Sequence, residues 1–186
     1  MRKLVLLDRD GTICEDSDYL SDWRKMRIFD YSCNAVKTIK NKGYEIYIIT
    51  NQAGVAKGKF SLDEAENQKK YVLSYFNKEE KLINDYLYCP HHKDGIITEF
   101  AIDCLCRKPK TGMIEKILNL NEIDPSNSYV VGDKLIDIEL ALNLKINPVL
   151  VLTGYGKEEL KKIQEKDYKV AIYDNLLDFA NKLKEI

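Results

Sequence analysis

Two aspartates follow the first apolar segment of the sequence and could support phosphoryl-transfer chemistry. Residues 4–7 are Leu-Val-Leu-Leu, and Asp8 and Asp10 come directly after them, separated by one arginine. Because side chains alternate along an extended strand, both carboxylates should point the same way, while Arg9 points aside and Gly11 lets the backbone turn sharply. Two carboxylates this close repel each other unless a cation lies between them, and hard oxygen ligands suit Mg²⁺. The pair alone is equally compatible with a polar turn after a strand.

Two further segments carry groups that suit a phosphate. Residues 45–50 form a β-branched and aromatic run that ends in Thr50 and is followed by two amide side chains. The Thr50 hydroxyl could donate to a phosphoryl oxygen, as could backbone N–H groups in the turn after it. Arg107 and Lys108 are adjacent and precede a proline, which fixes the backbone at that point. Lys108 is suited to neutralise charge between a nucleophile and a phosphoryl group, and Arg107 offers a planar fork for a second anionic group.

A fourth apolar segment, residues 129–131, is followed by Gly132 and two acidic residues. Asp133 would complete the oxygen ligands of a divalent cation, and Asp137 would orient them from one helical turn further on. In this order the four segments resemble the motifs of the haloacid dehalogenase superfamily of aspartate-nucleophile phosphatases, which here run from residue 8 to residue 137. The combined pattern is far more specific than any single motif and disfavours four coincidental strand ends.

The resemblance implies a role for each of these residues. Asp8 would attack phosphorus in line and form an aspartyl-phosphate, while Asp10 would protonate the leaving oxygen and then deprotonate the hydrolytic water. Thr50 and Lys108 would steady the phosphoryl group, because a carboxylate approaches a phosphate dianion only after cations neutralise the charge. The Mg²⁺ ligands would be oxygen atoms at two strand ends, namely Asp8, Asp10 through its backbone carbonyl, and Asp133, supported by Asp137.

Four further residues have the types and spacing of a closed zinc site. Cys89 and His91 are separated by one residue, and Cys104 and Cys106 form a second such pair directly before Arg107. Three thiolates and one imidazole make a tetrahedral Zn²⁺ site with no open position for water. Disulfides are the alternative, but the 5 cysteines are an odd number and no secretory signal precedes the first strand. We therefore expect a structural zinc loop over residues 89–106.

The zinc motifs and the Arg-Lys-Pro segment together resemble two phosphatase families, the heptose 1,7-bisphosphate phosphatases and the histidinol-phosphate phosphatases. The connection of residues 93–103 between the two ligand pairs is long, as in the heptose enzymes, whereas the histidinol-phosphate enzymes have a much shorter one. Lys134 also fits the heptose enzymes, because an arginine would be expected there in the other group. One departure from the heptose pattern is Thr111, which replaces the usual proline.

This resemblance implies removal of the 7-phosphate from D-glycero-D-manno-heptose 1,7-bisphosphate, a step toward nucleotide-activated heptose for lipopolysaccharide. Two alternatives stay open: a histidinol-phosphate phosphatase, and a non-catalytic phosphosugar-binding module stapled by zinc. The substrate-binding residues implied by the resemblance lie in loops after the strands, namely Asp16, Ser17, Asp18, Tyr19, Thr50, Asn51, Gln52, Ala53, Arg107, Lys108 and Lys134.

Composition excludes several other classes of function. The chain has 186 residues and a formal net charge of -1, with lysine and glutamate interleaved, so we expect a single domain over residues 1–186 and no nucleic-acid partner. No apolar stretch approaches the roughly 20 residues needed to span a bilayer, and Met1-Arg2-Lys3 leads straight into the first strand. We expect a cytoplasmic monomer that acts on a small sugar bisphosphate.

Strand and helix patterns alternate along the chain. This alternation predicts an α/β fold, a Rossmann-like doubly wound and mostly parallel sheet with helices on both faces. Strands are expected at residues 4–7, 45–50, 86–89, 129–131, 149–152 and 170–173, and helices at 32–42, 62–77, 112–120, 136–144, 157–166 and 175–184. No segment is long enough for a mobile cap, so the zinc loop and residues 16–24 would have to select the substrate.

Overall fold

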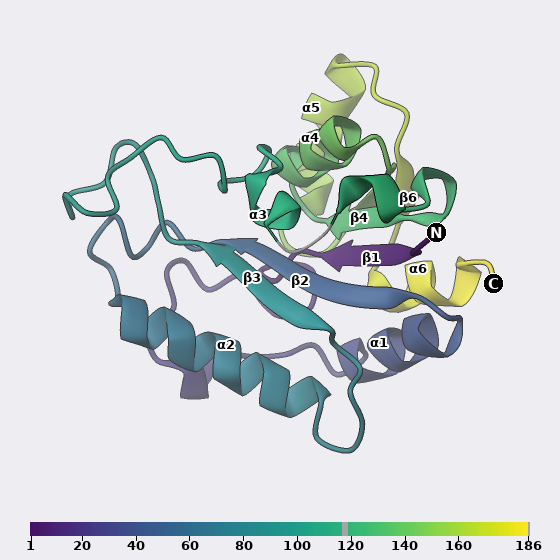
Figure 1. The fold of residues 1–186 in the computed structure, drawn as a ribbon, viewed down its shortest axis with the longest axis horizontal. Helices are drawn as coiled ribbons and strands as arrows, with labels where there is room; N and C mark the ends of the chain where they lie inside the picture. Colours follow the sequence, from purple (N-terminus) through teal and green to yellow (C-terminus); the bar gives the residue numbers. More distant parts are fainter. Residues whose placement is uncertain (117–118, 186) are drawn as a thin grey trace.

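The computed structural model describes residues 1–116 and 119–185. Six strands form one parallel sheet in the order β3-β2-β1-β4-β5-β6 (Figure 1). The strands are β1 (Leu4–Leu7), β2 (Glu45–Asn51), β3 (Asp85–Cys89), β4 (Tyr129–Gly132), β5 (Asn147–Val151) and β6 (Ala171–Tyr173). All the predicted strands are present, with end points within two residues of those expected.

Helices cover both faces of the sheet, as a doubly wound fold requires (Figure 1). The helices are α1 (Ser32–Asn41), α2 (Leu62–Phe76), α3 (Gly112–Glu115), α4 (Leu135–Leu144), α5 (Gly156–Glu165) and α6 (Leu176–Lys182), with short 3₁₀ turns at Trp23–Lys25, Leu120–Glu122 and Pro125–Asn127. In Figure 1, α1, α2 and α6 lie below the sheet, and α3, α4 and α5 lie above it. None of the helices in the described ranges is both long and apolar enough to cross a lipid bilayer.

Strand β1 shows why the sheet is stable with helices on both sides. All four of its residues are buried, which is typical of a central parallel strand whose two faces are both covered. Val5 and Leu7 pack into the apolar layer between the sheet and helices α1, α2 and α6. Leu4 and Leu6 pack into the layer on the opposite face, between the sheet and helices α3 and α4. The continuous apolar run at the start of the sequence therefore supplies both layers.

Helix α3 is shorter than predicted. The sequence pattern indicated a helix from Gly112 to Leu120, but the helix ends at Glu115 and Leu120 begins a 3₁₀ turn. Residues 117–118 of the predicted span lie outside the described residues. The side chain of Asn119 accepts a hydrogen bond from the backbone N–H of Asn121, and such a local turn competes with helix continuation.

The strand order places the functional segments at one edge of the sheet. The chain winds outward from β1 through β2 to β3, then returns to place β4 on the other side of β1 and continues to β5 and β6. In an open α/β sheet, ligands bind at the carboxyl ends of the strands where the winding direction reverses. That edge lies to the left in Figure 1, where the long loop after β3 also emerges. Across the described ranges, no additional folded domain is inserted between the strands.

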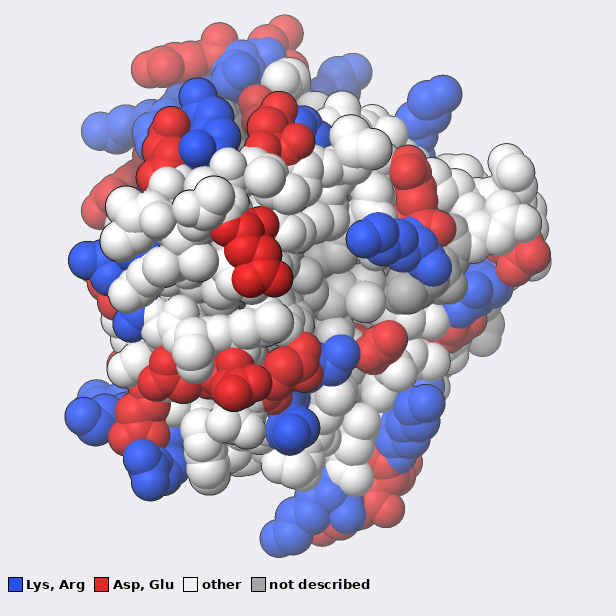
Figure 2. All heavy atoms as spheres, turned by 60° about the vertical axis from the view of Figure 1, so that its left-hand side comes forward, with Lys and Arg blue, Asp and Glu red and all other residues white. Residues whose placement is uncertain are grey.

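Charge on the surface is mixed in sign. On the face shown in Figure 2, basic and acidic side chains are interspersed. This arrangement differs from the continuous basic surface that is typical of proteins that bind nucleic acids.

Helix α2 begins with a reciprocal capping box that can be tested. The Ser61 hydroxyl accepts from the Glu64 N–H at 3.1 Å, and the Glu64 carboxylate accepts from the Ser61 N–H at 2.6 Å. We predict that Ser61→Ala lowers the free energy of unfolding by about 1 kcal/mol, because the first turn loses an acceptor. Urea denaturation would measure the change. Ser74→Ala, at an exposed position within the same helix, is the matched control. An equal decrease in the free energy of unfolding there would contradict the capping interpretation.

Candidate active site

A cavity of about 510 Å³ opens at the carboxyl edge of the sheet. All the residues predicted to contact substrate line it: Asp16, Ser17, Asp18, Tyr19, Thr50, Asn51, Gln52, Ala53, Arg107, Lys108 and Lys134, together with Asp8, Asp10 and Asp137. Asp133 does not line the cavity and is fully buried beside it. Segments that are more than 100 residues apart in the chain thus meet at one place, as the strand order requires.

Lys108 is a buried cation held between two carboxylates. Its Nζ atom lies 2.6 Å from Asp8 Oδ1, 2.6 Å from Asp137 Oδ1 and 3.0 Å from the carbonyl oxygen of Ile49. Burial alone would lower the pKa of Lys108, but the two carboxylates more than offset this and raise the pKa above its ordinary value. The lysine therefore stays charged beside the side chain of the predicted nucleophile.

Asp137 and Asn51 fix the position of this lysine. Asp137, which is expected to orient the metal ligands, contacts Lys108 through Oδ1 and accepts from the backbone N–H of Lys134 through Oδ2 at 3.2 Å. The Asn51 side chain accepts from the Lys108 N–H at 3.0 Å and donates to the Lys108 carbonyl at 3.2 Å. Asn51 therefore fixes the backbone of Lys108, in addition to lining the cavity.

Asp133 fits the role of a metal ligand. Its Oδ2 atom accepts from the Tyr155 N–H at 2.8 Å, whereas Oδ1 is buried and has no hydrogen-bond partner among the described residues. Carboxylate oxygens of Asp8, Asp133 and Asp137 lie within 4.8 Å of one another. Burial and the Asp8 charge raise the pKa of Asp133 to about 8, and burial likewise raises that of Asp8 to about 7. A crowded set of hard oxygen donors with one unpaired oxygen suits a divalent cation such as Mg²⁺.

Two glycines let the backbone approach Asp133 closely. Gly11 has φ of +83°, and a Cβ there would lie 2.1 Å from Asp133 Oδ2. Gly154 has φ of +52°, and its Cβ would lie 2.2 Å from the same oxygen. The Thr153 hydroxyl donates to the Gly11 carbonyl at 2.6 Å, which joins the two loops. The predicted sharp turn at Gly11 is confirmed, and its consequence is that backbone surrounds the Asp133 carboxylate.

Asp10 is held by groups that donate to both of its oxygens. The Arg9 guanidinium donates through Nε to Oδ1 at 2.9 Å and through Nη2 to Oδ2 at 2.7 Å. Gln52 Nε2 donates to Asp10 Oδ2 at 3.1 Å and to the Thr50 hydroxyl at 2.8 Å. Strand β1 ends at Leu7, so the alternation expected for an extended strand does not govern these residues. The guanidinium of Arg9 reaches the neighbouring carboxylate instead of only pointing aside.

The loop over residues 16–19 is attached to the walls of the cavity. Lys134 Nζ lies 2.7 Å from Asp16 Oδ2 and 4.7 Å from the ring centre of Tyr155. Lys57 donates to the Tyr19 hydroxyl at 2.7 Å. Further lining residues were not indicated by the sequence, namely Arg9, Leu20, Gly54, Ile136, Tyr155, Glu158, Glu159 and Lys162.

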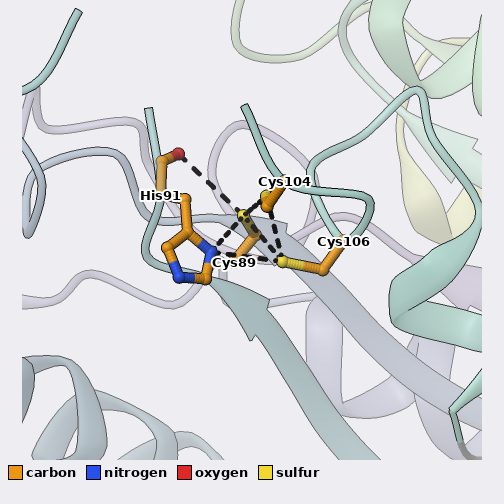
Figure 3. A group of neighbouring side chains, drawn as sticks. All are labelled: Cys89, His91, Cys104 and Cys106. Atoms are coloured by element: carbon orange, nitrogen blue, oxygen red, sulfur yellow. Dashed lines mark hydrogen bonds between the residues drawn. The ribbon is translucent and has the colours of Figure 1, made fainter. Parts of the chain in front are cut away.

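The four predicted zinc ligands meet beyond the end of β3 (Figure 3). The sulfur atoms of Cys89, Cys104 and Cys106 lie 3.2 to 3.4 Å apart, and His91 Nδ1 lies 3.3 Å from the Cys106 sulfur and 3.6 Å from that of Cys89. Sulfur ligands about 2.3 Å from a tetrahedral zinc ion lie roughly 3.8 Å apart, a few tenths of an ångström farther than these sulfur atoms. Disulfide sulfurs are only about 2.05 Å apart, so the disulfide alternative does not fit.

Arg107 follows the last zinc ligand and faces the cavity. Its Nη1 atom donates to the His91 carbonyl oxygen at 3.1 Å. Because a guanidinium has five N–H donors, this bond to the zinc loop leaves donors that can face an anion in the cavity. The cluster of cysteines and histidine therefore borders both Arg107 and the Lys108 backbone.

Comparisons with known proteins agree with this geometry. A sequence model of the family described as "HAD-hyrolase-like" matches residues 105–179. The chain is 33% identical over 189 residues to the D-glycero-beta-D-manno-heptose-1,7-bisphosphate 7-phosphatase of Haemophilus influenzae, covering 100% of this chain and 99% of the relative. It is 39% identical to the D-glycero-alpha-D-manno-heptose-1,7-bisphosphate 7-phosphatase of Photorhabdus laumondii, over 84% of this chain and 86% of the relative.

A solved structure is similar over almost the whole chain. The D,D-heptose 1,7-bisphosphate phosphatase from B. bronchiseptica, complexed with magnesium and phosphate, superposes with a TM-score of 0.82 at 26% identity, covering 97% of each chain. The resemblance drawn from the motifs is thereby confirmed. The chain belongs to the D-glycero-D-manno-heptose-1,7-bisphosphate 7-phosphatases, within the haloacid dehalogenase-like hydrolases.

Proposed function

We propose that this chain hydrolyses the 7-phosphate of D-glycero-D-manno-heptose 1,7-bisphosphate through an aspartyl-phosphate on Asp8, and that it uses Mg²⁺. The observation that carries the proposal is the 2.6 Å contact between Lys108 and Asp8 in a cavity that Arg107 and Lys134 also line. A cation beside the nucleophile allows a carboxylate to meet a phosphate dianion, and cations further away suit a second phosphate.

The reaction would proceed in two displacements at phosphorus. An oxygen of Asp8 attacks phosphorus as the bond to the sugar oxygen breaks, and Asp10 gives a proton to that oxygen. Asp10 then takes a proton from a water molecule whose oxygen attacks the aspartyl-phosphate, which releases inorganic phosphate and restores Asp8. Thr50 and Lys108 donate to the phosphoryl oxygens during both steps. Mg²⁺ held by Asp8, Asp133 and the Asp10 carbonyl would supply further charge neutralisation.

The second phosphate and the sugar would contact the outer part of the cavity. Arg107 can present a fork to an anion there, and Lys134 is held near the entrance by Asp16. Histidinol phosphate has an amino group in place of a second phosphate, so this pair of cations favours the bisphosphate. The phosphatase relatives and the presence of both Asp8 and Asp10 leave no specific support for a non-catalytic binding module.

The cysteine cluster would hold one structural Zn²⁺. Burial raises the pKa of the Cys89 thiol, and a bound cation would favour the thiolate that zinc requires. Thiols kept for a metal are typical of a reducing compartment, which supports action in the cytoplasm. The product would keep its 1-phosphate for nucleotide activation on the way to lipopolysaccharide.

The covalent mechanism is tested by replacing the nucleophile. We predict that Asp8→Asn lowers turnover by several orders of magnitude, because an amide oxygen is a poor nucleophile toward phosphorus. Steady-state phosphate release would measure the loss, and Asp174→Asn, an exposed site far along the chain, is the control. Turnover near the wild-type rate in Asp8→Asn would contradict an aspartyl-phosphate.

The zinc proposal predicts about one zinc per chain in protein purified without chelator. Cys104→Ser should remove most of that zinc and lower kcat/KM about 100-fold, because a displacement of about 1 Å in Arg107 or Lys108 is enough for such a loss. Metal analysis and phosphate release would be measured on the same samples. Cys33→Ser, outside the cluster, should change neither quantity. Full activity of zinc-free protein would overturn the proposal.

Substrate selectivity is tested at Arg107. We predict that Arg107→Ala lowers kcat/KM for the heptose bisphosphate about ten- to a hundredfold more than for p-nitrophenyl phosphate, because only the bisphosphate loses a charge-assisted hydrogen bond of about 1.5–3 kcal/mol. Arg27→Ala is the control, since Arg27 is exposed and does not line the cavity. An equal loss on both substrates would assign Arg107 to the transferred phosphate or to the loop fold.

A wild-type substrate panel completes this test. It would compare both heptose bisphosphate anomers, fructose 1,6-bisphosphate and histidinol phosphate by kcat/KM. We expect a heptose bisphosphate anomer to be the best substrate, and a preference for histidinol phosphate would refute the proposed activity.

A further inference from the structure

Arg9 is an arginine in the interior of the protein whose side chain connects two parts of the site. Its side chain is 3% exposed. One edge of the guanidinium donates to both oxygens of Asp10, and on the other side Nη1 donates to Gln68 Oε1 at 2.5 Å and to the Tyr86 hydroxyl at 3.0 Å. A buried guanidinium with donors bonded on both sides is held in one orientation. The carboxylate that it contacts is therefore oriented as well.

The hydrogen-bonded chain continues from Arg9 to the entrance of the cavity. Gln68 lies fully buried on α2, and its Nε2 atom donates to the carbonyl oxygen of Leu20 at 2.7 Å. Leu20 lines the cavity directly after the loop of residues 16–19. A continuous path thus runs from Asp10 through Arg9 and Gln68 to the backbone of residues 16–20, which we call the entrance loop.

We propose that Arg9 is a positioning residue that holds the Asp10 carboxylate where it can exchange a proton with the leaving oxygen, and that Gln68 ties this orientation to the entrance loop. The inference rests on the proposed function, in which Asp10 is the acid and base. An aspartate side chain has few atoms to restrain it, and a two-point contact fixes both its direction and the plane of its carboxylate. Proton transfer requires hydrogen-bond distance to the receiving atom, so loss of this restraint should slow it.

A merely structural ion pair would affect all substrates alike, whereas a positioning role depends on the leaving group. A sugar alkoxide must be protonated as it leaves, but p-nitrophenolate leaves without a proton. The value of kcat/KM reports the steps up to loss of the leaving group, so it separates the two cases. The test compares a sugar bisphosphate with p-nitrophenyl phosphate in the wild type, Arg9→Lys, Asp10→Asn and the double variant.

We expect Arg9→Lys to lower kcat/KM for the sugar bisphosphate about ten- to a hundredfold, and that for p-nitrophenyl phosphate less than about threefold, because lysine keeps the charge but not the fork. In the Asp10→Asn background, Arg9→Lys should cause little further loss for the sugar substrate. An equal loss on both substrates, or full additivity with Asp10→Asn, would overturn the inference.

A second variant keeps the test informative if Arg9→Lys does not fold. Gln68→Met preserves the length of the side chain but removes both hydrogen bonds, and it should give a smaller loss with the same preference for the sugar substrate. Tyr88→Phe is the matched control, because the Tyr88 hydroxyl bonds to Glu66 outside the path. An unchanged substrate ratio in Gln68→Met would overturn the link to the entrance loop.

The results also separate this inference from the proposed function. If Asp10→Asn is selective for the sugar substrate and Arg9→Lys is not, the role of Arg9 is overturned and the proposed reaction stands. If Asp10→Asn slows both substrates equally, the acid–base role of Asp10 fails and the inference fails with it.

Discussion

A lysine ammonium group in a protein interior stays charged only if anions lie close to it, and Lys108 meets this condition with Asp8 and Asp137. The contact joins the end of β1 to the first turn of α4, with the end of β2 adding a carbonyl oxygen. Removing either carboxylate would leave the buried ammonium group with only one carboxylate beside it. The positions of these three elements are therefore coupled, and the site exists only when the sheet places all of them together.

Lys108 follows the long loop after β3, so the conformation of this loop determines where the lysine lies. The cluster of Cys89, His91, Cys104 and Cys106 closes the base of the loop, and Asn51 fixes the backbone of Lys108 from the adjoining strand. A loop of this length has a large conformational entropy, which a metal at its base would reduce before substrate arrives. The loop of residues 89–106 thus borders the cavity through Arg107 and Lys108, which follow it directly.

The sequence predicted the parts of the site that follow from residue type and strand position. Asp8, Lys108 and the residues of the Cys/His cluster lie in short, specific motifs, and the parallel sheet brings strand ends together without further information. Side-chain orientation beyond a strand end could not be predicted in this way. The contact of Arg9 with Asp10 depends on where the chain turns, and Asn119 makes a local bond to the Asn121 N–H beyond the early end of α3. Such details arise from tertiary geometry, which the hydrophobic periodicity of a sequence does not predict.

The balance of charge at the base of the cavity explains why the arrangement suits a divalent cation. Four carboxylates, those of Asp8, Asp10, Asp133 and Asp137, gather around two cations, Arg9 and Lys108. Fully ionised, this group would carry two excess negative charges. Burial, together with the neighbouring carboxylates, raises the pKa values of Asp8 and Asp133 to about 7 and 8. Protons can relieve the repulsion, but they leave the carboxyl groups uncharged. A divalent cation relieves it while the carboxylates stay ionised, so the same crowding that destabilises them favours Mg²⁺.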